Sequence, residues 1–147
     1  MKQHKHIGVY ALVVHNDSIL LIKKARGPYT GKLDLPGGSL EFSENPLDGL
    51  KRELQEETGL SIKNQKLIDF LTHTVIYKDN NEEIQMYHLG IIYEVEISDT
   101  DTLKYTGDGE DSNGAIWVKI AEIDYKNLSP FAKILINNFN KPPLEKS

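Results

Sequence analysis

The stretch LPGGSLEFSENPLDGLKRELQEETGL, from Leu35 to Leu60, holds the clearest helix signal in the chain. Asn45 is a favourable N-cap, and Pro46 suits the first position of a helix. Gly59 can take the left-handed conformation that often ends a helix. The stretch therefore predicts a glycine-rich loop, a helix between Asn45 and Gly59, and a turn after it.

One side of the predicted helix is apolar, and the arc beside it is acidic. The apolar stripe consists of residues spaced three and four apart, which is the pattern of a core-facing helix: Leu47, Leu50 and Leu54. At 3.6 residues per turn, the acidic arc is roughly 100° wide. It is made of Glu53, Glu56 and Glu57. Glu57 is predicted to lie nearest the apolar stripe and Glu56 furthest from it.

This acidic arc has two interpretations, a solvated surface or a cation site. Carboxylates three and four residues apart repel one another, and Arg52 compensates only Glu56 at the favourable spacing of four. Negative charge in the C-terminal half of a helix also opposes the helix dipole. Carboxylate oxygens are hard ligands that suit magnesium, manganese or calcium. The unfavourable clustering favours the cation site.

The spacing of the fixed residues carries a family resemblance. Gly38 is followed after five residues by Glu44, and after seven more by RELQEETGL, residues 52–60. This resembles the Nudix box at every fixed position from Gly38 to Leu60. The resemblance implies an α/β/α sandwich with a mixed β-sheet between helices. It also implies hydrolysis of a pyrophosphate bond in a nucleoside diphosphate linked to another moiety, with Mg²⁺ or Mn²⁺ as cofactor.

The same resemblance implies roles for the residues of the box. The metal ligands would be Glu53, Glu56 and Glu57, with the backbone carbonyl of Gly37 or Gly38 nearby. Glu53 is also the candidate base for the attacking water. Arg52 would hold Glu53 in place, and Glu44 would pair with Arg52 or contact a metal through water.

Residues outside the box give further candidates. Family members often recruit another carboxylate from a loop, and Asp111 in GDGEDSNG is the first choice here, with Glu110 second or as a substrate contact. The alternative is a solvated acidic loop. Tyr29 and Arg26 are candidates for substrate binding. Other candidates for base stacking or phosphate contacts, with surface or core roles as the alternative, are Tyr77, Tyr87, Lys23, Lys24 and Lys32. The five histidines are separated in the sequence, and none is assigned to a metal.

The rest of the chain predicts hairpins and a second helix. Alternation of apolar residues and turn signals predict a hairpin of strands near 6–14 and 18–25, followed by an ordered loop over 26–38. They also predict a longer hairpin of 66–77 and 84–97 and a strand over 115–120. A helix is predicted over 129–139, and a frayed tail over 140–147. We expect one domain over residues 1–147.

Composition sets limits on function. The 147 residues carry a formal charge of −5 and contain no cysteine, which excludes disulfides and thiol catalysis. Stable binding to nucleic acid is not expected of so acidic a chain. No apolar run is long enough for a membrane span, and no signal peptide is recognised. We expect a cytoplasmic monomer or homodimer that acts on a small nucleotide.

Two other classes of protein remain as alternatives. A non-catalytic nucleotide-sensing module of the same fold would be expected to carry a degenerate box, whereas this box is intact. A structural calcium-binding protein would be expected to carry a loop with oxygen ligands at alternating positions. No such loop is found in the sequence.

Overall fold

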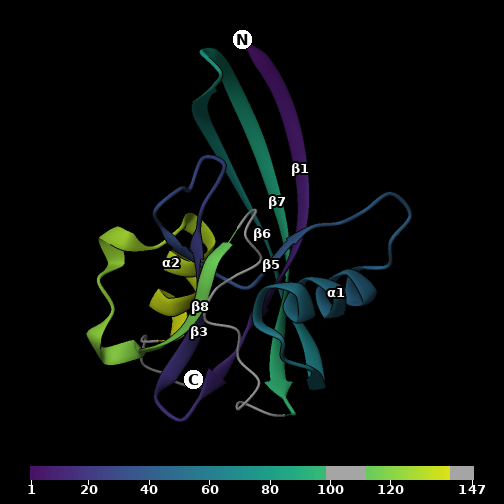
Figure 1. Ribbon diagram of the computed structural model, residues 1–147, viewed down its shortest axis with the longest axis vertical. Coiled ribbons are helices and arrows are strands. Elements are labelled where there is room, and N and C mark those ends of the chain that lie inside the picture. Colours follow the sequence, from purple (N-terminus) through teal and green to yellow (C-terminus); the bar gives the residue numbers. More distant parts are fainter. Residues whose placement is uncertain (99–111, 140–147) are drawn as a thin grey trace, which may run out of the picture.

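Two helices lie on opposite sides of the β-strands in the computed structural model, which describes residues 1–98 and 112–139 (Figure 1). The helices are α1 (Pro46–Thr58) and α2 (Pro130–Phe139), and two short 3₁₀ helices span Ile120–Glu122 and Tyr125–Asn127. The strands are β1 (Lys2–Leu12), β2 (Val14–His15), β3 (Ser18–Lys24), β4 (Leu33–Asp34), β5 (Gly37–Ser39), β6 (Ile62–Asp79), β7 (Glu82–Ile97) and β8 (Ser112–Lys119).

The strands form two sheets. One sheet has the order β5-β1-β7-β6, in which β1 pairs parallel with β7 and antiparallel with β5. The other is antiparallel, with the order β2-β3-β4 and with β8 paired to β3. The mixed pairing around β1 and the two flanking helices confirm the predicted α/β/α sandwich.

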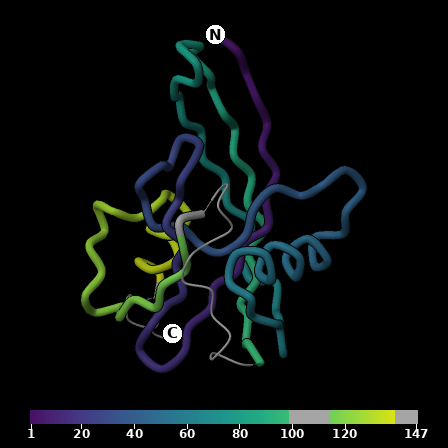
Figure 2. The backbone as a smooth tube through the Cα atoms, in the orientation of Figure 1, coloured from purple at the N-terminus to yellow at the C-terminus, as the bar shows by residue number. Residues whose placement is uncertain are grey.

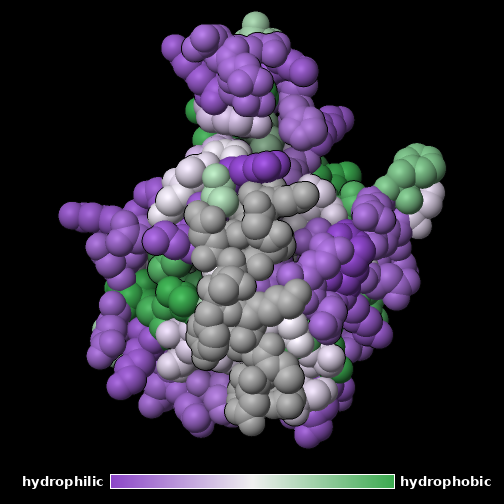
Figure 3. Space-filling model, viewed as in Figure 1, coloured by the Kyte–Doolittle hydropathy of each residue, from purple (hydrophilic) through white to green (hydrophobic). Residues whose placement is uncertain are grey.

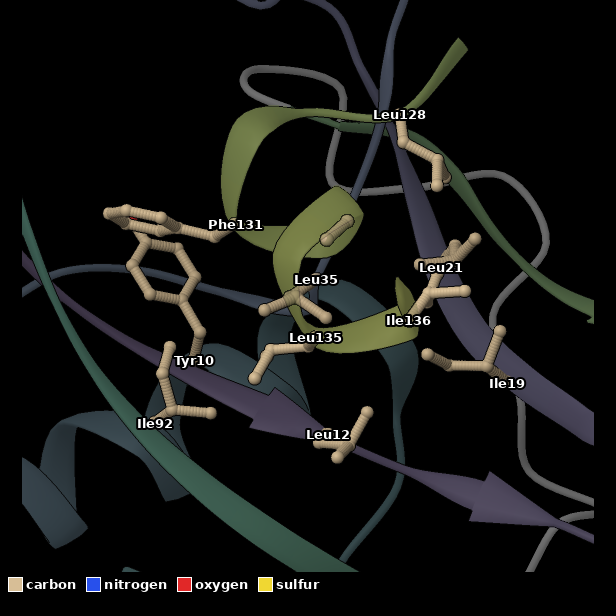
Figure 4. Packing of buried hydrophobic residues seen from close by; sticks show 11 residues of the cluster. Tyr10, Leu12, Ile19, Leu21, Leu35, Ile92, Leu128, Phe131, Leu135 and Ile136 are labelled. Atoms are coloured by element: carbon tan, nitrogen blue, oxygen red, sulfur yellow. The ribbon is translucent and has the colours of Figure 1, made fainter. Parts of the chain in front are cut away.

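Alternation along β1 explains how the sheet lies between the helices. Its odd residues pack with the apolar stripe of α1 in one core: Val9 and Ala11 with Leu50 and Leu54. Its even residues pack with α2 in a second core: Tyr10 and Leu12 with Phe131 and Leu135. Figure 4 shows the second core, where the rings of Tyr10 and Phe131 lie beside each other. Successive side chains of a strand point to opposite faces, so one strand supplies both cores.

The ends of α1 follow the prediction. The Asn45 side chain accepts a hydrogen bond of 2.9 Å from the Leu47 amide. Gly59 is left-handed with φ 75°, and its amide donates to the Gln55 carbonyl. Leu50 and Leu54 are fully buried, as the predicted apolar stripe requires. The box helix is therefore fixed at both ends and along its core-facing side.

Some predicted boundaries were wrong. The segment 26–38, expected to be a loop, contains β4 and the first residues of β5. Gly37 and Gly38 pair with Tyr10 and Val9 of β1, so tertiary pairing overrides the local turn signals there. β1 begins at Lys2. β6 and β7 are longer than predicted, because they continue to pair up to a tight turn and because β6 already pairs with β7 from Ile62. The predicted metal ligand Asp111, the alternative Glu110 and the tail 140–147 lie outside the described residues.

The three long strands β1, β7 and β6 extend beyond the rest of the molecule (Figure 2). β6 and β7 are joined by Asn80 and Asn81, whose φ angles of 49° and 65° suit a two-residue hairpin turn. Within residues 1–98 and 112–139, β7 is the only strand that pairs with β6, which therefore lies at the edge of its sheet.

The visible surface is mostly hydrophilic, and one of its hydrophobic areas projects over the loop between β5 and α1 (Figure 3). This loop carries Phe42, whose side chain is fully exposed. A search of the described residues finds no helix that is both long and apolar enough to cross a membrane.

Candidate active site

Arg52 is the centre of a network of ionic hydrogen bonds on α1. Its Nε and Nη2 each donate to Glu44 at 2.9 Å, which gives a bidentate pair. Its Nη1 donates to Glu53 at 2.9 Å and to Glu56 at 3.4 Å, and Nη2 also donates to the Ser39 carbonyl. A planar guanidinium holds carboxylates in a defined geometry. Arg52 thus fixes the carboxylate of Glu53 relative to Glu44 and β5.

Glu44 remains ionised over the whole physiological range. The hydrogen bonds from Arg52, with one from the Glu41 amide, lower the pKa of its carboxyl to about 2. The same contacts raise the pKa of the Arg52 guanidinium further above its ordinary value. The pair therefore stays charged and keeps Arg52 in place whatever the state of the other glutamates.

The glutamates of the box lie in different environments. Glu57 is buried and accepts a 2.7 Å hydrogen bond from the Gly37 amide, whereas the Glu56 side chain is 52% exposed. Burial raises the pKa of Glu57 well above its usual value, while the Gly37 amide and Lys24 act in the opposite direction. Glu57 and Glu56 lie nearest to and furthest from the core, as predicted.

The Gly37–Gly38 dipeptide lets the helix carboxylates approach β5. A Cβ atom on Gly38 would lie 2.8 Å from the Glu53 carboxylate, and one on Gly37 would meet the Val9 carbonyl. Gly37 also has φ +142°, which side chains with a Cβ rarely adopt. Gly38 therefore leaves room for the Glu53 carboxylate against this strand, and Gly37 lets the strand pair closely with β1.

The donor set of this corner consists of oxygen atoms. Carboxylates of Glu53 and Glu57 lie beside the Gly37–Gly38 backbone, and hard oxygen ligands suit Mg²⁺ or Mn²⁺. Among residues 1–98 and 112–139, no three acidic or histidine side chains converge closely enough to form a complete metal site. Arg52 binds Glu53 and Glu56 in this arrangement, while the Gly37 amide binds Glu57.

A pocket of about 240 Å³ starts at this corner. Gly38 and Glu53 line one part of it, and His4 and Met86 line another. Gly37 pairs with Tyr10 of β1, and His4 lies six residues earlier on the same strand, so the pocket follows β1 for roughly 20 Å. Such a length accommodates an extended small molecule that reaches from the box towards the start of β1.

The side walls of the pocket are basic and aromatic. The basic side chains are Lys24, Arg26, His4 and His6, and the aromatic ones include Tyr29 and Tyr77. Cations are expected to offset the negative field of an acidic protein near a bound polyanion. The pocket therefore combines basic groups with aromatic surface.

His88 forms the floor of the pocket between two tyrosines. Its Nε2 lies 2.6 Å from the Tyr10 hydroxyl, and its Nδ1 lies 3.1 Å from the Tyr29 hydroxyl. The Tyr29 ring stacks on the imidazole with 5.7 Å between centroids. A neutral imidazole has one donor and one acceptor, so one tyrosine donates to His88 and the other accepts from it. These bonds attach the segment that carries Arg26 and Tyr29 to β1 and β7.

Asp34 is a second buried polar group at the pocket. Its Oδ1 accepts hydrogen bonds from the Ser129 hydroxyl at 2.5 Å and from the Leu35 amide at 2.8 Å. Burial raises the pKa of its carboxyl, against the effect of these bonds and of Lys24. Asp34 thus joins β4 to the residue that precedes α2, and it fixes one side of the pocket.

The structure brings together only some of the predicted site residues. Gly38, Glu53, Arg26 and Tyr29 line the pocket, and Arg52 and Glu44 support Glu53 from behind. Tyr87, a candidate for base stacking, does not line this pocket and is 41% exposed.

Sequence reasoning missed His6, His88 and Asp34. The signal for His88 was its place in β7, where it occupies an alternate position among the buried residues Ile84, Met86 and Ile92. A polar residue at such a position is expected to have a buried partner. Its partners Tyr10 and Tyr29 lie far away in the sequence, and no local pattern indicates them.

We expect His88 to make the protein less stable in weak acid. Burial lowers its pKa to about 3, with further lowering by His6 and Lys24, whereas an unfolded histidine has a pKa near 6.5. The unfolded chain therefore binds one more proton between these values, so stability is complete above pH 6.5 and falls as the pH drops towards 3. Between pH 7 and pH 5 the loss attributable to His88 is about 2 kcal/mol.

The measurement is urea unfolding at pH 7 and pH 5 for the wild type and for His88→Gln. The variant removes the titrating group, so its stability should fall less than that of the wild type over the same interval. Equal changes in the two proteins would show that His88 does not titrate differently on unfolding.

Comparisons with known proteins identify relatives of this chain. The model of the NUDIX domain matches residues 4–139. An ADP-ribose pyrophosphatase of Methanocaldococcus jannaschii is 28% identical over 94 residues, which cover 64% of this chain and 52% of that protein. An 8-oxo-dGTP diphosphatase of Proteus vulgaris is 33% identical over 76 residues, covering 50% of this chain and 68% of that protein.

Solved structures agree in fold. A NUDIX hydrolase from Nitrosomonas europaea has a TM-score of 0.61 at 24% identity, with 91% of this chain and 87% of that chain covered. Among the curated relatives, the match spans only about half the length of the M. jannaschii protein. The structural likeness concerns the fold alone.

Proposed function

This chain belongs to the Nudix family, and from that we propose that it is a metal-dependent pyrophosphohydrolase acting on a nucleoside diphosphate linked to another moiety. The observation that carries the proposal is the position of Glu53. Arg52 holds its carboxylate beside Gly38, where the basic and aromatic pocket begins. The activities named for the two relatives, an ADP-ribose pyrophosphatase and an 8-oxo-dGTP diphosphatase, support the reaction class.

In the proposed reaction, water attacks a phosphorus of the substrate diphosphate. Glu53 accepts the proton of the water, the bond from phosphorus to the bridging oxygen breaks, and the leaving phosphate departs with that oxygen. Arg52 fixes the orientation of Glu53, and Glu44 fixes Arg52 through its two hydrogen bonds. A general base contributes roughly 10²- to 10⁴-fold to such a reaction.

We assign the metal to the acidic corner of the box. Glu53, Glu56, Glu57 and the backbone carbonyl of Gly38 are the proposed ligands, with a further carboxylate from Asp111. Mg²⁺ or Mn²⁺, when bound there, supplies positive charge to the phosphate oxygens and lowers the pKa of bound water. Glu57 supports this assignment. Burial near other acidic groups disfavours the charged form of its carboxyl, and a nearby cation would stabilise that form.

The pocket is the proposed site for the rest of the substrate. Lys24 and Arg26 would meet phosphates beyond the one attacked, since both line the pocket. Tyr29 is buried against His88, so its role is to form the wall and not to move onto a base. Glu110 remains a proposed substrate contact from the segment before β8.

The test is a malachite green phosphate assay on a panel of nucleotides with Mg²⁺. A nucleoside triphosphate cleaved to pyrophosphate gives phosphate only when inorganic pyrophosphatase is added. A substrate such as ADP-ribose gives phosphate only when alkaline phosphatase is added to cleave its phosphomonoester products. Excess EDTA should abolish cleavage when the nucleotide products are measured directly by chromatography, because the two coupling enzymes themselves need metal ions. Binding of a nucleotide without turnover under any condition would instead favour a sensing module.

We expect Gly38→Ala to lower kcat roughly 10- to 100-fold, since displacement of a reacting group by about 1 Å has costs of this size. The added Cβ would lie 2.8 Å from the Glu53 carboxylate, which must then move. The end of a glutamate side chain yields easily, so the thermal melt should change little. Wild-type kcat in the variant would show that the position of Glu53 against β5 is not critical.

A further inference from the structure

The edge strand β6 has an unprotected segment. Most edge strands carry charges, prolines or bulges that prevent pairing with another chain. The run FLTHTVIY, Phe70 to Tyr77, contains no Asp, Glu, Lys, Arg, Pro or Gly. The bulges of β6 lie before Asp69, and the pairing with β7 is regular from Asp69 to Asp79. This segment is therefore a regularly paired, uncharged sheet edge.

Two large apolar side chains on this segment face solvent. Phe70 is 56% exposed and Ile76 is 53% exposed. They lie six residues apart, an even number, so both point to the same face of the sheet. Exposure of this kind on an edge strand marks a surface for a partner strand or a site of aggregation.

We propose that β6 pairs antiparallel with β6 of a second copy of this chain, centred on His73. A two-fold pair of this kind uses the same edge on both copies, so it closes and leaves neither edge open. It would join the β5-β1-β7-β6 sheets of two molecules into one continuous sheet. The proposal concerns the assembly and does not depend on the proposed reaction.

Strand geometry limits the registers of such a pair. Opposite residues of an antiparallel pair direct their N–H and C=O groups either both towards the partner strand or both away. This direction alternates along a strand, so opposite residues must both be odd-numbered or both be even-numbered. The two-fold axis that relates two copies of one strand therefore passes through a residue and not between two residues. Only two centres keep seven residues of the uncharged run opposite one another, namely His73 and Thr74.

Charge selects between these two registers. A pair centred on Thr74 places Asp69 opposite Asp79, and Phe70 opposite Lys78. A pair centred on His73 places Phe70 opposite Ile76 at both ends of the run, and sets no like charges opposite each other from Lys66 to Asp79. Like charges in direct opposition destabilise a sheet, and aromatic pairs with β-branched residues stabilise it. The sequence of β6 is thus complementary to itself in one register.

The absence of cysteine allows a direct test of the register. In the His73-centred pair, residue 73 lies opposite its own copy, with Cα atoms about 4.5–5.5 Å apart, within reach of a disulfide. The His73→Cys chain should therefore form a covalent dimer on mild oxidation. Thr72→Cys and Thr74→Cys should each fail alone, because equivalent residues are then too far apart. An equimolar mixture of these two should link, because residue 72 lies opposite residue 74.

The association itself is measured by light scattering after size-exclusion chromatography over a concentration series. We expect a mass of twice 16.7 kDa for the wild type at high concentration. Phe70→Lys and Ile76→Lys should each weaken the dimer at least tenfold. Phe42→Lys, which removes an even more exposed ring away from the edge, should not. Circular dichroism confirms that the variants fold.

Each alternative result overturns the proposal. A monomer at all concentrations would show that β6 does not pair with a second copy, and a strand of another protein would then be the candidate partner. A dimer that resists both lysine variants and gives no cross-link at residue 73 would use another surface. A cross-link strongest for Thr74→Cys would show the register that the charges disfavour.

Discussion

Glu53→Gln is expected to lower kcat by at least about 100-fold, the smallest loss expected when a general base is removed. The amide oxygen can still accept the hydrogen bond that Arg52 now donates to the Glu53 carboxylate at 2.9 Å. It cannot accept a proton from water, and it is a weaker metal ligand. Glutamine forms helices about as well as glutamate, so the melting temperature in metal-free buffer should be unchanged or slightly higher.

The matched control is Leu54→Ala at the next residue. Leu54 is fully buried against β1, so its truncation should cost roughly 2–5 kcal/mol of stability. Its remaining activity should follow the folded fraction. If Glu53→Gln kept more than about a tenth of wild-type turnover, Glu53 would be neither the base nor an essential ligand. Those roles would then pass to Glu56, Glu57 or the loop at 110–111.

Phe131→Ala should cost about 3–5 kcal/mol of stability, as expected for truncation of a buried phenylalanine. The Phe131 ring is 2% exposed and lies 4.4 Å from the imidazole of His88 and 5.8 Å from the ring of Tyr10, between centroids. It also occupies the space above Gly90, where a Cβ would meet the ring. Removal of the ring leaves a cavity directly under the pocket floor.

Urea unfolding of Phe131→Ala and of Ile134→Ala provides the measurement. Ile134 lies on the same helix but is 38% exposed, so its truncation should cost far less. A loss below about 1 kcal/mol for Phe131→Ala would mean that the core closes over the missing ring, because uncollapsed cavities of this size cost more. Such a result would also predict that His88, the floor of the pocket, shifts into the space of the missing ring.

The box helix could be predicted from the sequence because its signals are local. Asn45, Pro46 and Gly59 mark its ends within a few residues, and the spacing of Leu50 and Leu54 sets its buried side. The environments of Glu56 and Glu57 then follow from helical periodicity alone. The hairpin turn at Asn80–Asn81 is local in the same sense.

The pocket could not be predicted, because non-local pairing assembles it. His6 lies opposite His88 only through the parallel register of β1 and β7. Tyr10 reaches the box because Gly37 pairs with it, in a segment whose glycines and proline indicated a loop. No pattern within a short window contains either register. The chemistry-bearing residues of the box were therefore visible in the sequence, but those of the pocket walls mostly were not.

The parallel pairing of β1 also bears on how the chain reaches its native state. Each residue of β1 pairs with one 82 positions later, as Lys2 does with Ile84. During synthesis the first strand therefore waits for β7 to emerge, although α1 and the β2–β3 turn can form early from their local signals. Loops of this length are slow to close, and folds dominated by such distant pairing fold in milliseconds to seconds, not microseconds. The pocket is consequently among the last parts of the molecule to form, and the exposed edge of β6 is available to other chains throughout that delay.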